Sequence, residues 1–524
     1  MSRTTTVNFP GSARSHTIPT GLHVNGEWID LDDSFDVVDP ATGAGFASVS
    51  DGTKAHARAA LDAAHGAQPS WADLAPRVRG DLVHAVHRLL TDRADAFIDL
   101  MVLESGKPRS EAIGEMALTL DFVKWLAEQA AHVHGSFSRA SRGNFRIIAT
   151  MQPVGPSLLI SPWNFPLLVP GRKVAAALAA GCTAILKPAE QTPLTSALLM
   201  QTIIDAGIPP GVINLVHTTR PGELSTELMG DPRLCKVSFT GSMSVGSLMM
   251  SQAARNIIGV QLELGGNTPF IVLDDADAQT AATEAVAAKF RNAGQACVAA
   301  NRIILQRGIA EEFTELFVDE VRKLVVGPGY RPGVDIGPMI SEKQRHAISR
   351  TVENVLAGKA EALLGGKPIG GDGYFFEPTV LAMRDTAPDF SCQELFAPVA
   401  PLYVVDSIGE AVAFANATPY GLAAYLFTRD VSRAVSISER LDVGMVGVTV
   451  ASWPTRRRRS AGSNPPAWAA RAVSAPWKTS WRPNTSPSPR IDMHAETSMR
   501  YPALGNLTRG LGSRGYPHNH PGER

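Results

Sequence analysis

Short apolar runs alternate with amphipathic helical patterns through most of this chain, which leaves few folds open to it. The runs SLLISPWN, TAILKP and GVINLVH are separated by helical patterns, and KVSFTG, VQLELGG and PFIVLDD form a second series. Strands that alternate with helices build parallel sheets from β–α–β units. Because 524 residues exceed the usual size of one core, the sequence predicts two α/β domains.

The region before these runs has a different pattern. Residues 54–135 place Ala, Leu, Val and Phe at three- and four-residue spacing, which predicts a helical region. Residues 1–21 lack such a pattern, and we expect them to be flexible. They also lack the apolar segment of a signal peptide, and no run in the sequence reaches the length of a membrane span.

Charge and cysteine content narrow the function classes. The net charge is −1, but from Thr449 onward 12 Lys and Arg oppose 3 Asp and Glu, which leaves −10 on the first 448 residues. A mildly acidic body gives no electrostatic case for nucleic-acid binding. The cysteines at positions 182, 235, 297 and 392 have neither metal-ligand nor disulfide-framework spacing. We expect a cytoplasmic protein in a reducing compartment, with no metal, nucleic-acid or membrane partner.

Two side chains of the second series could carry covalent chemistry. Cys297 lies in the unhindered stretch FRNAGQACVAANR, and Glu263 stands near the end of a strand-like run. A thiol nucleophile that forms a thioester needs a base to activate water for its hydrolysis, and Glu263 could be that base. Singly, each has a simpler explanation, because a lone Cys is usually a buried apolar residue and the Glu could be a capping or solvated residue.

Two further features could bind a substrate oxygen and a phosphate. Asn164 follows an apolar strand in PWNFP, so its amide could donate to an oxyanion, although Asn is also a common turn residue. In KVSFTGSMSVG, a strand runs into Gly241 and Ser242, and Gly246 follows at the start of a helix, an arrangement that binds pyrophosphate. The spacing is not GxGxxG, so this motif alone is weak.

The motifs PWNFP, KPAEQTP, SFTGS, ELGGN, GQAC and QELFAP, taken together and in this order, resemble the NAD(P)-dependent aldehyde dehydrogenase superfamily. The resemblance covers about residues 22–448. It is closest to the succinate-semialdehyde dehydrogenases in GRKVAAALAAGC, ELGGNTPFIV and KFRNAGQACVAANR.

This resemblance implies an α/β aldehyde dehydrogenase fold with a Rossmann-like NAD-binding domain, a catalytic domain and a β oligomerisation flap. It also implies a homodimer or homotetramer. The implied segments are a flexible N-terminus over 1–21, the NAD-binding domain over 22–262 with an oligomerisation hairpin near 136–153, the catalytic domain over 263–448, and a tail over 449–524.

The resemblance also implies a role for each candidate. Cys297 attacks the aldehyde, and Asn164 together with the Cys297 backbone N–H stabilises the thiohemiacetal oxyanion. Hydride passes to the nicotinamide, and Glu263 activates water against the thioester. The positions that match cofactor-binding residues of the family are Trp163, Lys187, Glu190, Gly241, Ser242, Gly246, Glu394 and Phe396.

Cofactor and substrate choice rest on charged residues. Glu190 matches the position beside the adenosine ribose, where a carboxylate accepts from a 2′-hydroxyl but repels a 2′-phosphate. This favours NAD over NADP, although the nearby Lys187 could offset the repulsion. Arg172 and Arg291 match positions that grip a distal carboxylate, for which guanidinium groups are well suited.

The sequence leaves several alternatives open. Each arginine could instead form a surface salt bridge, and glutarate semialdehyde would fit as well as succinate semialdehyde. A CoA-acylating enzyme or a catalytically silent relative is less favoured, because Cys297, Asn164 and Glu263 are all present. In QELFAP, Ala397 stands where Gly is common in the family, which would matter if that position needs positive φ.

The family pattern stops at GMVGV, residues 444–448. If each later codon borrows the last base of the one before, residues 449–472 can encode NRGLVADPAAPFGGVKPSGLGREG and residues 477–486 can encode MEDFLETKYV, the missing family motifs in order. We infer that one base was lost near codons 448–449, so that the run of four arginines at 456–459 is shifted code. We therefore expect the chain as written to lack the last strand of the flap, to carry a disordered tail, and to be poorly assembled and much less active.

Overall fold

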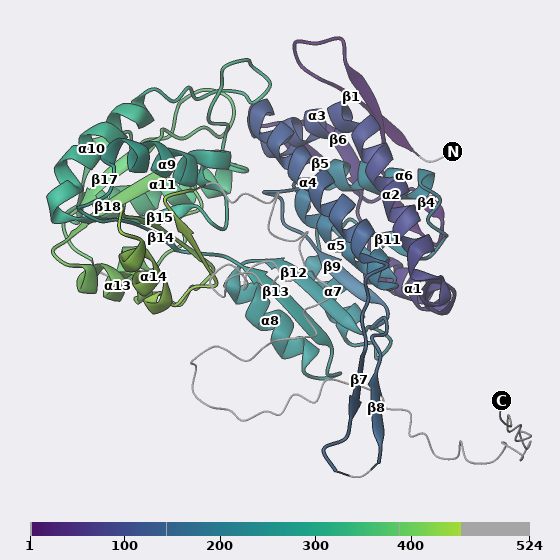
Figure 1. Cartoon of the computed structure of the whole chain (residues 1–524). Helices are drawn as coiled ribbons and strands as arrows, with labels where there is room; N and C mark the ends of the chain where they lie inside the picture. The colour runs from purple at the N-terminus through teal and green to yellow at the C-terminus, as the bar shows by residue number, and fades with distance from the viewer. Residues whose placement is uncertain (1–2, 143, 387, 452–524) are drawn as a thin grey trace, which may run out of the picture. The chain divides into compact units, whose positions relative to one another are not determined.

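The computed structural model describes residues 3–142, 144–386 and 388–451. These residues form two seven-stranded sheets and three two-stranded hairpins, with helices packed against the large sheets (Figure 1). Both large sheets are mainly parallel, so the predicted α/β class is confirmed.

The first sheet is made by the runs of the first series together with KVSFTG and VQLELGG. Its central strands are parallel, and a short antiparallel pair closes one side. In spatial order the strands are β13 (Gly259–Leu264), β12 (Lys236–Gly241), β9 (Ser157–Ile160), β10 (Ala184–Lys187), β11 (Ile213–Leu215), β3 (Leu22–Val24) and β4 (Glu27–Ile29).

Helices cover both faces of this sheet because its strands are apolar on both sides. Leu158 and Ile185 belong to one core, whereas their chain neighbours Leu159 and Leu186 belong to the other, as the two-residue period of a strand requires. The helices of this part are α1 (Lys54–Asp73), α2 (Pro76–Asp92), α3 (Ala94–Ser105), α4 (Arg109–Gln129), α5 (Leu168–Ala180), α6 (Pro193–Asp205), α7 (Pro221–Met229) and α8 (Met243–Ala253).

The second sheet repeats the same construction. All its strand pairs are parallel except the pair at one edge. In spatial order the strands are β16 (Ala360–Leu364), β17 (Thr379–Met383), β18 (Val399–Val405), β15 (Ala300–Gln306), β14 (Thr268–Val272), β19 (Ala423–Phe427) and β20 (Met445–Val448).

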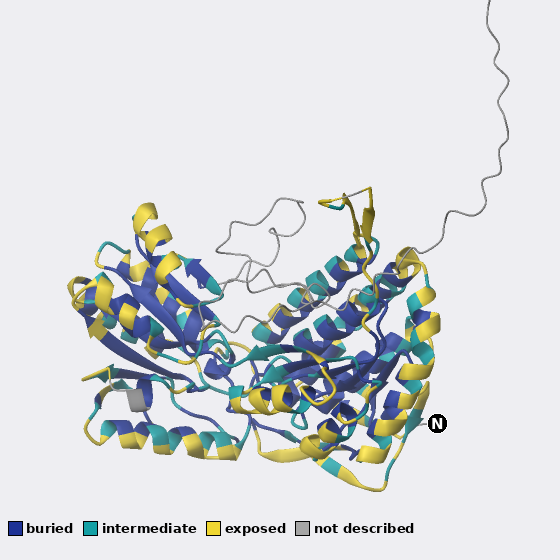
Figure 2. Cartoon of the chain, turned by 90° about the horizontal axis from the view of Figure 1, so that it is seen from below, coloured by how far each residue is buried: buried dark blue, intermediate teal, exposed yellow. Residues whose placement is uncertain are grey.

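Side-chain caps fix where several helices of the second part begin. Asp277, Ser341, Ser407 and Asp430 each accept a hydrogen bond from a backbone N–H of the first helical turn. The helices are α9 (Ala278–Phe290), the short 3₁₀ turn η1 (Arg291–Gly294), α10 (Arg307–Arg322), α11 (Glu342–Leu356), α12 (Pro388–Ser391), α13 (Ile408–Asn416) and α14 (Val431–Arg440). Figure 2 shows buried strands between helices whose outer faces are exposed.

The passage from one sheet to the other lies a few residues later than the predicted boundary at 262/263. Strand β13 ends at Leu264 and β14 begins at Thr268, so Gly265–Asn267 connect the sheets. Glu263 therefore belongs to the edge strand of the first sheet, where it pairs with Thr240, and not to the start of the second domain.

The prediction that residues 1–21 are flexible is wrong for the described part. Strands β1 (Thr4–Asn8) and β2 (Ser15–Pro19) form an antiparallel hairpin. Val7 and Ile18 are 2% and 1% exposed and join the large core beside the first sheet, which orders the segment. Hairpin β5 (Ser34–Asp39) and β6 (Ala44–Ser50) follows.

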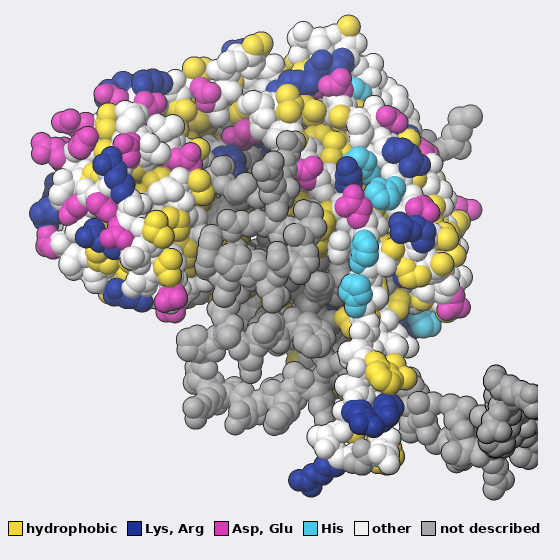
Figure 3. Space-filling model, viewed as in Figure 1, with side chains coloured by type: hydrophobic (Ala, Val, Ile, Leu, Met, Phe, Trp, Pro, Cys, Tyr) yellow, Lys and Arg dark blue, Asp and Glu magenta, His cyan; other side chains and the backbone are white. Residues whose placement is uncertain are grey.

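A third hairpin belongs to a separate unit of the chain, residues 133–151. Strands β7 (Ser136–Arg139) and β8 (Arg146–Ala149) pair antiparallel within the range predicted for an oligomerisation hairpin. Phe137 and Phe145 are 69% and 74% exposed, and Figure 3 shows apolar and basic side chains together on this hairpin. Its role in assembly stays a prediction.

The predicted aberrant tail, residues 449–524, lies outside the described residues except for Thr449, Val450 and Ala451. Ala451 is buried in the core beside the second sheet, and its N–H donates to Glu284 at 2.6 Å. Among the helices of the described ranges, none is both long and apolar enough to cross a membrane.

Candidate active site

The predicted site residues of the first sheet share its carboxyl edge. Lys187 and Gly241 end β10 and β12, Glu263 is the last residue but one of β13, and Asn164 follows β9. These four strands are parallel neighbours, so their ends meet along one edge. Ligands of open α/β sheets bind at this edge.

Asn164 is held in one orientation. Its side chain is buried, and Nδ2 donates to the backbone oxygen of Gln295 at 3.0 Å. That bond uses one of the two amide hydrogens and leaves the other for an acceptor beside the loop that carries Cys297. The turn predicted from PWNFP thus lies against the GQAC segment, which is 131 residues away in the sequence.

The loop before Cys297 has an unusual backbone. Asn292 and Ala293 have φ of 53° and 55°, and Gly294 follows at 72°. Left-handed conformations are rare for residues other than glycine, so neighbouring groups must hold this turn. A Cβ at Gly294 would collide with the carbonyl oxygen of Ala397, which explains the glycine at this position.

Several charged groups surround the half-buried Cys297 thiol. Burial raises the pKa of Cys297 to about 11, and the carboxylate of Glu263 acts in the same direction. Glu394 raises the pKa of Cys297 further, whereas the positive charges of Arg291 and Arg172 lower it. The structure therefore brings these five predicted residues within electrostatic range of one another.

The turn after β13 packs tightly against both Glu394 and the loop that carries Cys297. Gly266 N–H donates to the Glu394 carboxylate at 3.0 Å, and a Cβ at Gly266 would collide with the carbonyl oxygen of Cys297. Burial raises the pKa of Glu394, while Lys289 and the Gly266 N–H lower it. The two glycines of ELGGN thus permit a close approach that larger residues would prevent.

The residues predicted to hold a dinucleotide fit such a ligand. Ser242 is exposed at the N-terminus of α8, and a Cβ at Gly246 would meet Leu264 at 2.5 Å, so glycine lets this helix approach β13. The buried Thr240 hydroxyl has no hydrogen-bond partner among the described residues. A phosphate at this helix N-terminus would meet free backbone N–H groups.

Further along the edge, Lys187 Nζ lies 3.3 Å from the Glu190 carboxylate. Burial lowers the pKa of Lys187, and Glu190 opposes that shift. The aromatic rings of Trp163 and Phe396 meet edge to face, with centroids 5.5 Å apart.

The positive φ considered for position 397 occurs one residue earlier. Phe396 has φ of 47°, whereas Ala397 does not adopt positive φ. Ala397 is fully buried, and its carbonyl oxygen packs against Gly294. Alanine at 397 therefore causes no backbone strain, and the family's glycine is not required there.

Arg172 and Arg291 are both half-buried near the thiol. The Nε atom of each is buried without a hydrogen-bond partner among the described residues. Arg172 also lies 5.7 Å from the centre of the Phe122 ring. A buried guanidinium nitrogen with no acceptor is a site where an anion would be stabilised.

Sequence reasoning missed several buried charged residues at this site. Lys173 donates to the carbonyl oxygens of Ile160 and Ser238 at 2.8 and 3.0 Å, and burial lowers its pKa well below the usual value. Contacts to the turn that bears Asn164 and to the loop before Cys297 come from Lys107, just before α4, and from Glu111 and Glu115 on α4. The signal for the two glutamates was their four-residue spacing in SEAIGE, which places them on one helix face.

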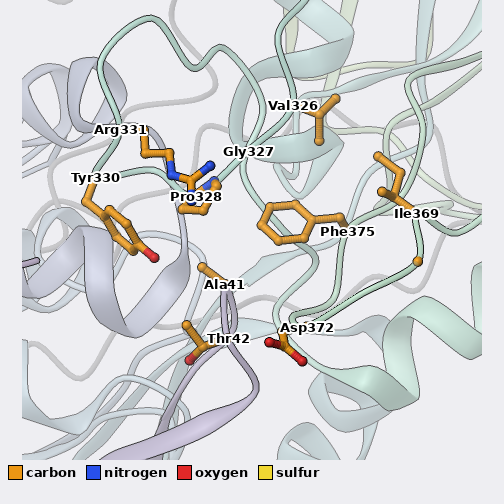
Figure 4. A pocket seen from close by; sticks show the side chains of 11 residues that line it. Ala41, Thr42, Val326, Gly327, Pro328, Tyr330, Arg331, Ile369, Asp372 and Phe375 are labelled. Carbon is orange, nitrogen blue, oxygen red and sulfur yellow. The ribbon is translucent and has the colours of Figure 1, made fainter.

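A separate pocket of about 360 Å³ is formed by other segments (Figure 4). Its lining comes from the turn after β5, the segment after α10 and the loop at 369–375. It includes the ring of Phe375, the phenol of Tyr330 and the charged side chains of Arg331 and Asp372. None of the predicted site residues lines it.

Comparison with known proteins identifies relatives across both sheets. The aldehyde dehydrogenase family model matches residues 28–462. Over 401 residues the chain is 45% identical to a succinate-semialdehyde dehydrogenase of Paenarthrobacter nicotinovorans, covering 76% of this chain and 89% of that protein. An NADP⁺ succinate-semialdehyde dehydrogenase of Escherichia coli is 41% identical over 81% of this chain and 88% of its own length.

Other relatives act on other aldehydes. A glutarate-semialdehyde dehydrogenase and a 3-sulfolactaldehyde dehydrogenase of Pseudomonas putida are 40% and 41% identical, over 81% and 82% of this chain and 88% of each protein. Among solved structures, an E. coli NADP-dependent enzyme superposes with a TM-score of 0.82 at 40% identity, covering 83% of this chain and 91% of that chain. A Staphylococcus aureus betaine aldehyde dehydrogenase in complex with NAD⁺ gives 0.80 at 32% identity, covering 83% and 88%.

Matches of this extent define the class as NAD(P)-dependent oxidoreductases whose substrates are small-molecule aldehydes. The chain belongs to the aldehyde dehydrogenase family, and its two-sheet architecture is the fold of that family. Members of the family use NAD or NADP.

Proposed function

We propose that this protein oxidises succinate semialdehyde to succinate, with NAD⁺ preferred as the hydride acceptor. The observation that carries the substrate assignment is the pair Arg172 and Arg291. Each has a buried Nε without an acceptor among the described residues, and both act electrostatically on Cys297. A short aldehyde with a carboxylate at its far end would satisfy the guanidinium groups while its carbonyl carbon reaches the thiol.

The chemistry begins at Cys297. The Cys297 thiol first releases its proton to solvent. The resulting thiolate adds to the carbonyl carbon, and the carbonyl π electrons move to the oxygen to give a thiohemiacetal oxyanion. The free amide hydrogen of Asn164 and the backbone N–H of Cys297 donate to that oxygen. Because the bond from Asn164 to Gln295 already fixes the amide, little reorganisation is needed when the charge develops.

Collapse of the oxyanion expels hydride from the same carbon and leaves a thioester on Cys297. Bound NAD(P)⁺ supplies the hydride acceptor. Glu263 then removes a proton from water, the resulting hydroxide attacks the thioester, and the acid leaves with release of the thiol. The position of Glu263 near the end of β13, two residues before the turn at Gly265 and Gly266, supports its role as the base.

Cofactor preference follows from Glu190. Its carboxylate lies 3.3 Å from Lys187 Nζ at the edge where the adenosine ribose is expected. The Glu190 carboxylate would accept a hydrogen bond from a 2′-hydroxyl. It would repel a 2′-phosphate, because Lys187, the nearby cation, is already paired with Glu190. We propose that this pair selects against NADP.

The test is steady-state NADH formation with three aldehydes of different length and charge. Arg172→Met and Arg291→Met should each raise KM for succinate semialdehyde by about tenfold or more, as the loss of a charge-assisted contact predicts. Oxidation of uncharged butyraldehyde should change little, and Cys297→Ala should abolish turnover of both. An equal loss for charged and uncharged aldehydes would remove the basis of the proposal.

The same assay separates the competing substrates and cofactors. A higher kcat/KM for glutarate semialdehyde than for succinate semialdehyde would reassign the chain length while keeping the two arginines. A preference for NADP over NAD would contradict the role given to Glu190.

A further inference from the structure

Three charged residues at and just before the start of α4 are not used by the proposed chemistry. Glu111 and Glu115 are four residues apart on α4 and therefore project from the same side of the helix, while Lys107 lies in the segment just before the helix begins. Buried charges are retained in a core only with specific partners. Here the partners belong to the two loops that form the oxyanion site.

Lys107 and Glu115 hold the turn that bears Asn164. Their side chains are each 1% exposed and form an ion pair at 2.5 Å. Lys107 Nζ also donates to the backbone oxygen of Asn164 at 2.8 Å. Glu115 accepts from the N–H groups of Leu167 and Leu168 at 2.9 and 3.0 Å, which fixes the start of α5 directly after the turn.

Glu111 holds the other loop. The backbone N–H of Asn292 donates to both carboxylate oxygens, each at 2.9 Å. Asn292 is the first of the residues with left-handed backbone before Cys297, so this bond acts where the loop is strained. Burial raises the pKa of Glu111 to about 7, so these hydrogen bonds are strongest above that pH, where the carboxylate is ionised.

The side chain of Asn292 then joins the two loops to each other. Its Nδ2 donates to the backbone oxygen of Asn164 at 3.1 Å and to that of Gln295 at 3.2 Å. Gln295 is also the acceptor for the Asn164 amide. The loops are therefore fixed both by α4 and through one shared asparagine.

We propose that Lys107, Glu111 and Glu115 form a clamp of positioning residues that sets the distance between the Asn164 amide and the Cys297 loop. The clamp rests on the proposed catalytic roles of Asn164 and Cys297. It acts mainly on the geometry of the oxyanion site, and its one link to the guanidinium pair is the electrostatic attraction between Glu111 and Arg291. Its loss therefore lowers kcat far more than it weakens substrate binding.

Glu111 gives the sharpest test, because its removal leaves the Lys107–Glu115 ion pair in place. Glu111→Ala should lower kcat by about 100-fold, the effect expected when a catalytic group is displaced by about 1 Å. KM for succinate semialdehyde should rise far less than kcat falls, since Arg172 is untouched and Arg291 keeps its charge. Glu111→Gln keeps one acceptor for Asn292 and should recover part of kcat.

Glu128→Ala is the matched control, because Glu128 lies exposed on the same helix. It should match the wild type in kcat, in NADH affinity measured by fluorescence, and in thermal unfolding. If Glu111→Ala lost NADH affinity and thermal stability in proportion to kcat, Glu111 would be a general structural residue and the clamp would be refuted.

A second readout needs neither aldehyde nor cofactor. Iodoacetamide should alkylate Cys297 about threefold faster or more in Glu111→Ala than in the wild type, because a released loop exposes the thiol. Wild-type rates of both alkylation and turnover in Glu111→Ala would overturn the clamp. If the wild type shows no Cys297-dependent turnover of any semialdehyde, the proposed function fails, and the alkylation contrast still decides whether Glu111 holds the loop.

Discussion

At the scale of single residues, the reactivity of Cys297 is set by what surrounds it. Thiolates are nucleophiles and neutral thiols are not, so the pKa decides how much of the protein is reactive at a given pH. Burial and two carboxylates favour the neutral thiol, and Arg291 and Arg172 only partly oppose them. The thiol is therefore mostly protonated at neutral pH, and we expect its oxidation and alkylation to be slow there.

This environment predicts the pH dependence of Cys297 alkylation. A raised pKa means that the thiolate fraction increases with pH up to about 11, so the rate with iodoacetamide should still be rising at pH 10. Glu263→Gln removes a negative charge and should shift the profile to lower pH. The measurement is alkylation of the wild type, with Cys297→Ala to subtract reaction at the half-buried Cys235 and Cys392. A plateau below pH 9 in the wild type would contradict the expectation.

At the scale of elements, two helices at the sheet edge are capped from elsewhere in the chain. Neither α5 nor α6 receives a cap from its own N-terminal side chain. Glu115 accepts the first N–H groups of α5, and Glu104 accepts the N–H and hydroxyl of Thr195 in α6. Buried carboxylates thus replace the local caps, which ties the helix starts to α3 and α4.

The Lys107–Glu115 pair should show the energetics of a buried ion pair. Lys107→Met leaves Glu115 charged and unpaired in the core, and should lower the free energy of unfolding by about 3–5 kcal/mol. The double variant Lys107→Met/Glu115→Gln removes both charges, keeps an acceptor for α5, and should regain a large part of that loss. Denaturant unfolding measures both.

Lys124→Met, an exposed position on α4, is the control and should change stability little. A double variant no more stable than Lys107→Met would show that the unpaired carboxylate is not the cause of the loss.

At the scale of the whole molecule, the site exists only because two separately built sheets meet. Glu263 comes from the edge strand of the first sheet, while Cys297 precedes β15 at the centre of the second. The second sheet in the described residues has β20 at one edge, and unpaired edge strands invite pairing with another chain. We propose that the native enzyme assembles as a homodimer or homotetramer through the hairpin of β7 and β8 and the last strand of the flap.

The inferred loss of one base near codons 448–449 can be tested by comparing the chain as written with a chain in the alternative reading frame from residue 449 onward. A chain whose residues from 449 follow the alternative frame, NRGLVADPAAPFGG and onward, should show a much higher kcat than the chain as written and a single oligomeric species. The physical reason is that the restored segment completes the site and supplies the last strand of the flap. Activity assays and light scattering after size-exclusion chromatography measure both effects. Equal activity and the same oligomer in the two chains would refute the shifted reading as a cause of impairment.

Much of the fold could be predicted because the relevant signals are short-range. The runs at 157–160, 184–187 and 236–241 became neighbouring parallel strands, and the helical pattern from 54 became α1 to α4. The two-residue period of a strand and the 3.6-residue period of a helix can each be recognised within a few positions. A glycine that directly follows a strand is a local signal of the same kind. Asn164, Glu263 and Cys297 were each noticed in a local motif, but their catalytic roles were assigned only from the motifs taken together and stay a prediction.

The sequence alone determined the order of the helices and strands, the presence of two α/β domains, and the candidate residues for catalysis and binding. Only the tertiary structure decided that Glu111 holds Asn292 across 181 residues, that Val7 and Ile18 order the N-terminus, and that positive φ falls on Phe396 and not on position 397. The partner of a buried charge and the conformation of a strained loop depend on packing between distant segments. No local pattern encodes such packing, because its energy arises only once the two sheets are folded and in contact.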